Sequence, residues 1–127
     1  MNHVAIIGNM TREAEHSQTS SGRSVCKLGI AVNERWKNRE GNQQEIVTYI
    51  NVTVWGAQAD TCAKHLGKGS KVAVEGKLRL NEWETKDGQK RKDMYVQADR
   101  VEFLSHSKSD ERAAGQGDYD EDSNLPF

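Results

Sequence analysis

With 127 residues, the chain is long enough for one domain with its own core and leaves little room for a second. Its mean hydropathy is −0.86, and no apolar run approaches the roughly 18 residues of a membrane span, which argues against a membrane protein. A strand-like run begins within the first few residues, so we expect no signal or transit peptide and a cytoplasmic location.

The net charge of −1 is unevenly distributed along the chain. Residues 1–104 hold 16 basic and 13 acidic residues, a balance of +3, whereas residues 105–127 hold 2 and 6, a balance of −4. A weakly basic body with an acidic tail indicates one surface for nucleic acid and one segment for another task. Cys26 and Cys62 lie far apart without a CxxC motif, so neither a disulfide framework nor a zinc site is predicted. We expect Cys26 to pack as a small apolar residue.

The first part of the chain contains two strand signals separated by a loop signal. Residues 3–8 (HVAIIG) predict a strand, and the polar, serine-rich residues 11–22 predict a loop. Residues 25–33 alternate apolar and polar side chains, which predicts a second strand. The side chains expected to face inward are Cys26, Leu28, Ile30 and Val32. Gly29 and Ala31 leave the outer face bare, so a flat ligand or another backbone can approach it.

Residues 34–43 are charged and contain Gly41, so we interpret them as a flexible hairpin loop that carries Trp36. The following residues, 44–56 (QEIVTYINVTVWG), are the strongest strand signal of the chain. One parity of this strand suits a core: Ile46, Ile50, Val52 and Val54. The other parity presents Tyr49 and Trp55 among small polar residues. Such a strand is either buried on both sides or a binding platform.

The second half of the chain predicts one helix and two further strands. Residues 57–69 repeat Ala59, Cys62, Ala63 and Leu66 at helical spacing and end at Gly67 or Gly69. Residues 71–83 alternate again, with Val72, Val74, Leu78 and Leu80 expected inward. After a turn at Asp87 and Gly88, residues 94–104 form the last strand, whose parity shifts near residues 98–100 and so indicates a bulge.

Together these elements predict an all-β fold of five strands, with one short helix between the third and the fourth. The pattern is compatible with the OB-fold, a partly open five-stranded barrel that binds oligomers on one face and on its loops. From residue 105 onward there is no comparable periodicity, and we predict a disordered acidic tail.

Aromatic and basic side chains gather at positions that are not expected to be buried. Four of the eight aromatic residues are placed in this way: Trp36, Tyr49, Trp55 and Trp83. The basic residues around them are Arg35, Lys37, Arg39, Lys71, Lys77, Arg79, Lys90, Arg91 and Lys92. Bases stack on exposed rings with about 1–3 kcal/mol each, and lysine or arginine side chains contact the phosphates. Duplex DNA hides its base faces, so the pattern favours single strands.

Several of these side chains also have a purely structural interpretation. Trp55 ends a strand beside Gly56 and could cap the core, and Tyr49 could face a partner subunit. Burial is the alternative for Trp83 as well, although its neighbours Glu82 and Glu84 oppose it. Any single arginine or lysine could simply be a solvated charge.

The longer motifs resemble the bacterial-type single-stranded DNA-binding proteins (SSBs). The matching stretches are VAIIGNMTREAE, LGIAVNERWKNREG, YINVTVWG, HLGKG followed by SKVAVEGKLRLNEWETKDGQ, and an acidic C-terminus ending in NLPF. The resemblance implies an OB-fold core and a homotetramer that wraps single-stranded DNA without sequence preference, without enzymatic activity, cofactor or metal, in association with the nucleoid. It also implies base stacking at Trp36, Tyr49, Trp55 and Trp83. Tyr49 stands where Trp is common in the family, and Trp55 where Phe is common.

The resemblance further implies three parts: a DNA-binding domain (1–104), a flexible linker (105–117) and an acidic tip (118–127) that docks replication and repair proteins. The residues expected to form the docking tip are Asp120, Glu121, Asp122, Leu125, Pro126 and Phe127. A terminal Phe with its carboxylate suits an apolar pocket edged by basic groups. Ser123 and Asn124 interrupt the acidic run that is usual there, and the linker is short for the family. The alternative is a tail that only improves solubility.

Two other functional classes remain open from the sequence. One is an OB-fold protein that binds RNA or acts in replication restart mainly as an interaction module. The other is a metal-dependent nuclease, which needs clustered carboxylate or histidine ligands. That class is disfavoured because no ligand-like partner lies at a useful spacing from any of the four histidines, His3, His16, His65 and His106.

Overall fold

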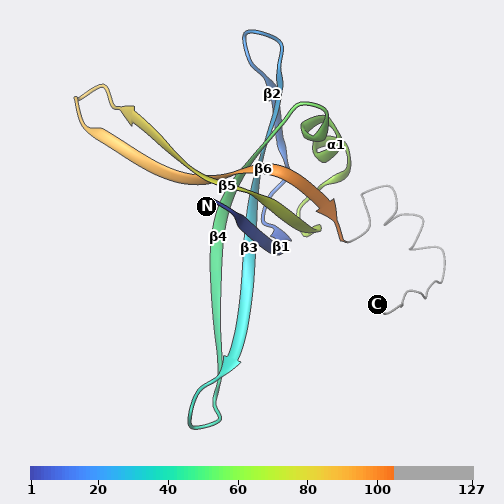
Figure 1. The fold of residues 1–127 in the computed structure, drawn as a ribbon, viewed down its shortest axis with the longest axis vertical. Helices are drawn as coiled ribbons and strands as arrows, with labels where there is room; N and C mark the ends of the chain where they lie inside the picture. The colour runs from blue at the N-terminus through green and yellow to red at the C-terminus, as the bar shows by residue number, and fades with distance from the viewer. Residues whose placement is uncertain (105–127) are drawn as a thin grey trace, which may run out of the picture.

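A computed structural model of the chain describes residues 1–104. They form the elements β1 (Val4–Met10), β2 (Glu15–Gln18), β3 (Ser24–Lys37), β4 (Gln43–Trp55), α1 (Ala57–His65), β5 (Lys71–Glu84) and β6 (Lys90–Phe103). Figure 1 shows these elements in chain order. The predicted linker and docking tip lie outside the described residues.

The five strands close into a barrel because β1 pairs with both edges of the sheet that the other four strands form. The strand order is β1-β5-β6-β4-β3, and β1 pairs with β5 along most of its length. At its end, Asn9 and Met10 of β1 pair with Ala31 and Ile30 of β3, which completes the circle. The helix α1 lies between β4 and β5, the third and fourth strands of this barrel. The predicted all-β barrel with one helix is therefore confirmed.

Strand β2 is an addition that the sequence did not signal. It pairs with the free edge of β3, from Glu15 opposite Lys27 to Gln18 opposite Ser24. All four of its side chains are exposed, so it has no apolar alternation to reveal it. The prediction of a loop over residues 11–22 is therefore wrong for this short polar strand.

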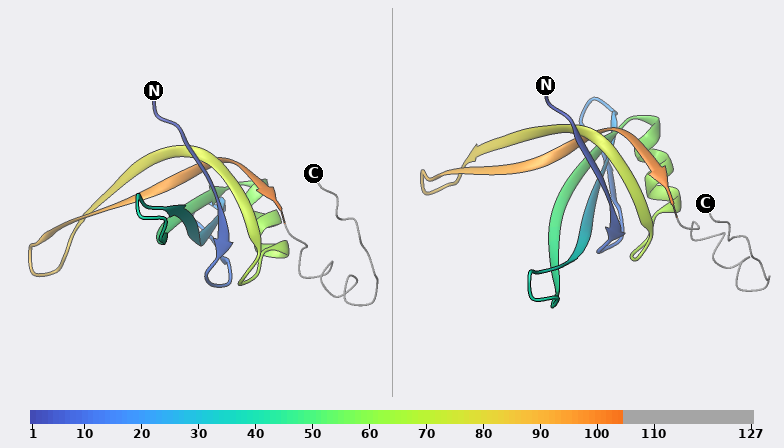
Figure 2. Two further views of the ribbon diagram at one scale, coloured as in Figure 1. Left: turned by 90° about the horizontal axis from the view of Figure 1, so that it is seen from below. Right: turned by 60° about the horizontal axis from the view of Figure 1, so that its bottom comes forward.

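Two long hairpins, β3–β4 and β5–β6, project from the barrel in different directions (Figures 1 and 2). In the first, β3 runs to Lys37 and β4 begins at Gln43, so the connecting loop is only residues 38–42. The predicted loop over residues 34–43 is too long, and Trp36 lies on a strand. The Asn38 side chain closes the turn, because its Oδ1 accepts hydrogen bonds from the backbone N–H groups of Glu40 and Asn42 at 3.0 and 2.9 Å.

The core lies inside the barrel and under α1. Its most deeply buried side chains include Leu28, Ile30, Val52, Val54, Val72, Val74, Val96, Cys26, Cys62 and Leu66. Inward parity was predicted correctly for the barrel portions of the strands but wrongly for Ile46, Leu78 and Leu80, which are 49%, 41% and 49% exposed. These three residues keep the core parity, but they lie on the projecting hairpins, where no opposite layer covers them.

The predicted irregularity in the last strand is a β-bulge. Glu75 pairs with Arg100 and Gly76 pairs with Ala98, so Asp99 is the extra residue on β6. The Gln58 side chain of α1 fastens this bulge, because its Oε1 accepts from the Val101 N–H at 3.0 Å and its Nε2 donates to the Asp99 carbonyl at 3.1 Å. The helix is thus tied to the sheet by polar contacts as well as by its apolar face.

Both cysteines are core residues. Cys26 on β3 is fully buried, which confirms its expected role as a small apolar residue, and Cys62 on α1 is 1% exposed. Burial raises the pKa of Cys26 to about 11 and the pKa of Cys62 to about 12. Both thiols are therefore protonated at neutral pH and contribute packing rather than reactivity.

Gly76 on β5 is required because the backbone of β6 leaves no room for a side chain at this position. A Cβ atom at this position would lie 2.1 Å from the Gln97 carbonyl oxygen, which is part of the strand backbone. We expect Gly76→Ala to lower the free energy of unfolding by about 1–3 kcal/mol, measured by urea denaturation. The control is Gly29→Ala, where the obstacles are the side chains of Arg12 and Thr11, which can move, so a smaller loss is expected. Wild-type stability of Gly76→Ala would contradict this account.

Candidate nucleic-acid interface

A groove of about 520 Å³ crosses one face of the barrel. Its floor is formed by outward side chains of β3 and β4, and residues of β5 and β6 line it as well. The basic, aromatic and small polar residues that line the groove include Arg12, Lys27, Asn51, Thr53, Trp55 and Tyr95. The groove therefore combines aromatic rings, cations and small polar groups, the types that contact bases and phosphates.

The register of β3 and β4 places Tyr49 and Trp55 on the same face of the sheet. Tyr49 is opposite Ala31, and Trp55 is opposite Val25, with even spacing between the two pairs. The sequence-based expectation of a bare surface at Gly29 is wrong, because the Arg12 and Thr11 side chains cover the outer side of this residue. Tyr49 is 74% exposed, and Trp55 is half-buried at the edge of the groove. Trp55 thus lines the groove and is not enclosed in the core.

The positively charged side chain of Arg23 lies over the Trp55 ring. The Arg23 guanidinium carbon lies 4.4 Å from the centroid of the Trp55 ring, a cation–π contact. Arg23 directly precedes β3 and follows the turn from β2. Its carbonyl accepts a hydrogen bond from the Thr19 N–H at 2.9 Å, and its own N–H donates to Thr19 Oγ1 at 3.2 Å. The turn between β2 and β3 therefore places an arginine on the predicted stacking platform.

Trp36 lies on the opposite face of the β3–β4 hairpin from Tyr49 and Trp55. It pairs with Gln44, an odd number of positions from the Ala31–Tyr49 pair, and successive pairs alternate between faces. Its ring is 50% exposed. The sequence-based grouping of Trp36 with Tyr49 and Trp55 therefore holds for exposure but not for a common face.

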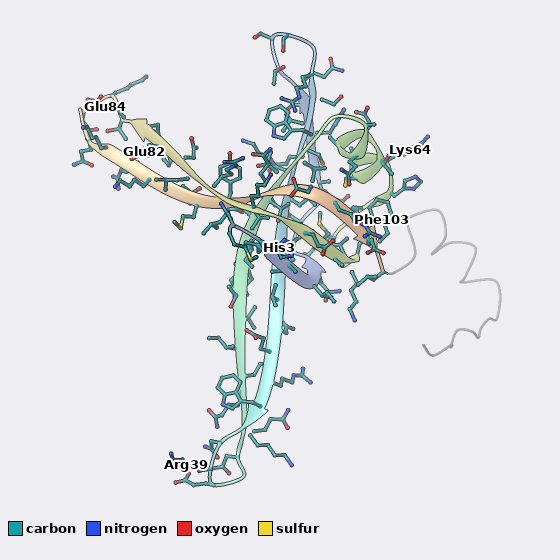
Figure 3. All side chains as sticks on the ribbon, viewed as in Figure 1. His3, Arg39, Lys64, Glu82, Glu84 and Phe103 are labelled. Carbon is teal, nitrogen blue, oxygen red and sulfur yellow. The ribbon has the colours of Figure 1, made fainter. Side chains whose placement is uncertain are left out.

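The basic residues predicted around Trp36 are spread over the hairpin. Arg35 and Lys37 share the face of Tyr49, and the Arg35 guanidinium is 3.6 Å from the Glu45 carboxylate across the ladder. Arg39 lies at the tip of the hairpin (Figure 3). All three are exposed, so phosphates can reach them.

Trp83 stands on the second hairpin, on a face that leads into the barrel groove. It pairs with Arg91, and the next pairs on the same face are Asn81 with Asp93 and Arg79 with Tyr95. Asn81, Asp93 and Tyr95 also line the barrel groove. The Trp83 ring is 46% exposed and borders a shallow hollow of about 270 Å³ with Arg91. A continuous strip thus runs from Trp55 toward the tip of β5–β6.

The remaining predicted phosphate contacts are divided between the two faces of β5–β6. Lys77 and Arg79 share the Trp83 face, and Arg79 Nε donates to Gln97 Oε1 at 3.1 Å. Lys90 and Lys92 lie on the other face, where Lys92 Nζ is 4.0 Å from a Glu82 carboxylate oxygen. Figure 3 shows Glu82 near the tip of this hairpin. Lys71 is at the opposite end of β5, in register with Asn9, and is not part of the strip.

Four basic or aromatic residues at the groove were not selected from the sequence: Arg12, Lys27 and Tyr95 line it, and Arg23 lies on the Trp55 ring. Arg12 reaches the groove because Gly29 has no side chain, and a Cβ there would lie 1.9 Å from Arg12 Nη1. Its guanidinium is also 3.6 Å from the Glu15 carboxylate. Parity alone would have found Lys27 and Tyr95, whereas Arg12 and Arg23 depend on the path of β2.

Within residues 1–104, no cluster of three or more His, Cys, Asp or Glu side chains could hold a metal ion. The one helix in this part of the chain is too short and too polar to cross a membrane.

Comparison with known proteins gives one family and many relatives. The model of the single-strand binding protein family matches residues 1–104. A single-stranded DNA-binding protein of Wolinella succinogenes is 37% identical over 119 residues, which cover 94% of this chain and 70% of that protein. A protein of the same description from Deinococcus radiodurans is 44% identical over 105 residues, which cover 83% of this chain but only 35% of that protein.

Two solved structures have the same fold. The single-stranded DNA-binding protein of Thermus aquaticus, a deletion mutant, matches with a TM-score of 0.73 and 27% identity over 83% of this chain and 51% of that one. The Plasmodium falciparum SSB, solved in complex with single-stranded DNA, matches with a TM-score of 0.76 over 83% and 96% of the two chains. At 23% identity, this second likeness concerns the fold alone.

Proposed function

Because the chain belongs to the single-strand binding protein family, we propose that it binds single-stranded DNA without sequence preference and protects it. The observation that carries this proposal is the strip of rings and cations from the half-buried Trp55 and Tyr95 in the groove to the exposed Trp83. Family membership also confirms the resemblance recognised in the sequence and supports a binding protein rather than an enzyme.

The binding mechanism follows from the geometry of the groove and hairpins. Bases stack on Trp55, Tyr95 and Trp83 along one strip, while Tyr49 and Trp36 offer two further surfaces on the other hairpin. Arginine and lysine side chains between the rings contact the phosphates, which makes affinity fall with salt. Stacking accepts any base because every base has a π-face, and it excludes a duplex because paired bases are already stacked.

The proposal extends to the cellular role and to the part of the chain outside the described residues. We assign residues 1–104 to DNA binding, residues 105–117 to a linker and residues 118–127 to docking of replication and repair proteins in the nucleoid. The chemistry that supports docking is an acidic run (Asp120, Glu121, Asp122) followed by apolar Leu125, Pro126 and Phe127.

A homotetramer is also part of this proposal. Within the described residues, Val4–Gly8 of β1 pair only with β5, so the other edge of this segment can accept a further strand. The core-parity face of β5–β6 leaves Leu78, Leu80 and Met94 exposed, at 41%, 49% and 58%. An open strand edge and an uncovered apolar face on one molecule support association between copies.

Tryptophan fluorescence during titration tests the proposal directly. We expect oligo-dT to quench the emission strongly, because bases stack on Trp36 and Trp83, which are half exposed. A duplex of equal length should quench little, and added salt should weaken oligo-dT binding. Absence of quenching by oligo-dT would contradict single-strand binding through these rings.

Substitution of single rings tests the stacking model. Trp36→Ala and Trp83→Ala should each weaken oligo-dT binding by about 5- to 100-fold, which corresponds to roughly 1–3 kcal/mol for one lost stack. Both side chains are exposed, so the melting temperature should stay near that of the wild type. Trp36→Phe and Trp83→Phe are the matched controls and should retain most of the affinity. Unaltered affinity in both alanine variants would rule out stacking at these positions.

Deletion of residues 122–127 tests the docking role of the tip. The truncated protein should bind oligo-dT with unchanged or greater affinity, because it keeps residues 1–104 and loses negative charge. It should fail to capture replication and repair proteins in a pull-down, since the apolar anchor is gone. Equal recovery of these proteins by the full and the truncated chain would contradict the docking proposal.

A further inference from the structure

The Arg23–Trp55 contact is the feature of the groove that the proposed function does not yet explain. The guanidinium covers a face of the Trp55 ring at 4.4 Å, although this ring is one of the predicted stacking surfaces. A base that reaches this face must therefore meet Arg23 first. The arginine either blocks the ring or takes part in binding.

The attachment of Arg23 favours participation. Its backbone is fixed by two hydrogen bonds with Thr19, so the position of the Cα atom beside the groove is defined. Its side chain is exposed, and none of the ion pairs within the described part of the chain involves it. Arg12, by contrast, is 3.6 Å from Glu15. The Arg23 guanidinium can thus move away from the ring without breaking a carboxylate contact.

We propose that Arg23 and Trp55 form a two-sided clamp, in which one base of the single strand inserts between the guanidinium and the indole. The inference rests on the proposed function, because it names how one base is held at that site. A stacked layer needs about 3.5 Å on each side, so the guanidinium has to move outward by roughly 3 Å from its present position. The rotatable bonds of an arginine side chain allow this while the turn stays in place.

The guanidinium group is suited to this role for a specific physical reason. It is planar and weakly hydrated, so it stacks on a base while its N–H groups remain free for a phosphate. A lysine ammonium carries the same charge but offers no flat face. The clamp therefore depends on the shape of the Arg23 side chain as well as on its charge, and this difference can be measured.

The first experiment compares Arg23→Ala and Arg23→Lys in oligo-dT titrations of the full chain. Both variants should bind about 3- to 10-fold more weakly than the wild type, since the stacking face is lost in both. Wild-type affinity of Arg23→Lys would show that Arg23 supplies only charge and would overturn the clamp. Unchanged or tighter binding by Arg23→Ala would overturn it as well, because the arginine would then be dispensable or would merely block the ring.

The second experiment tests whether Arg23 acts through Trp55. In a Trp55→Leu background, which keeps apolar bulk but removes the ring, Arg23→Ala should cause less than about a twofold further loss. Arg39→Ala, at the distant hairpin tip, is the matched control and should weaken binding by the same factor with or without Trp55 (Figure 3). An equal effect of Arg23→Ala in both backgrounds would overturn the clamp.

The outcome for the clamp is separate from the outcome for the proposed function. If Trp83→Ala weakens oligo-dT binding while the Arg23 variants bind as the wild type does, the clamp is overturned and single-strand binding stands. If the wild type itself does not bind oligo-dT, the proposed function fails, and the clamp fails with it.

Discussion

The closure of the barrel by the end of β1 is the constraint on which the rest of the structure depends. Asn9 and Met10 pair with β3, and the Met10 N–H donates to the Ser70 carbonyl at 2.8 Å. Met10 is 2% exposed, so the join is apolar as well as hydrogen-bonded. It fixes the size of the barrel, and strands of 13 or 14 residues are longer than such a barrel needs. Their excess length becomes the two hairpins that carry Trp36, Tyr49 and Trp83.

The sequence predicts the barrel well because burial there follows a period of two. Leu28, Val52 and Val74 alternate with polar or small neighbours, and all three are in the core. The same rule fails for Leu80, because the parity of a strand continues past the point where the opposite layer ends. Sequence alternation reports which face a residue is on. It does not report whether anything covers that face, which depends on tertiary structure.

The candidate site divides along the same line. Exposure of Trp36 and Trp83 followed from their charged neighbours, and the groove position of Trp55 followed from parity. Trp36 lies on the opposite face of the hairpin from Tyr49 and Trp55. This could not be predicted from the sequence, because it depends on the register of β3 with β4, which only the hairpin turn defines. The positions of Arg12 and Arg23 could not be predicted either, because they depend on the path of β2, a strand with no apolar residue to signal it. The residues that approach a site from a polar edge are therefore the ones that sequence patterns leave out.

The end of β6 lies on a different side of the barrel from the tips of the two hairpins. Leu104 follows β6 and donates its N–H to the Lys71 carbonyl at 2.9 Å, so the described chain finishes beside the start of β5 and close to α1. The free ends of both hairpins lie away from this point (Figures 1 and 2). The segment that we propose for recruitment therefore leaves the barrel at a point away from both hairpin tips. Its attachment point on the barrel does not cover the side chains of the hairpins that we propose to contact the single strand.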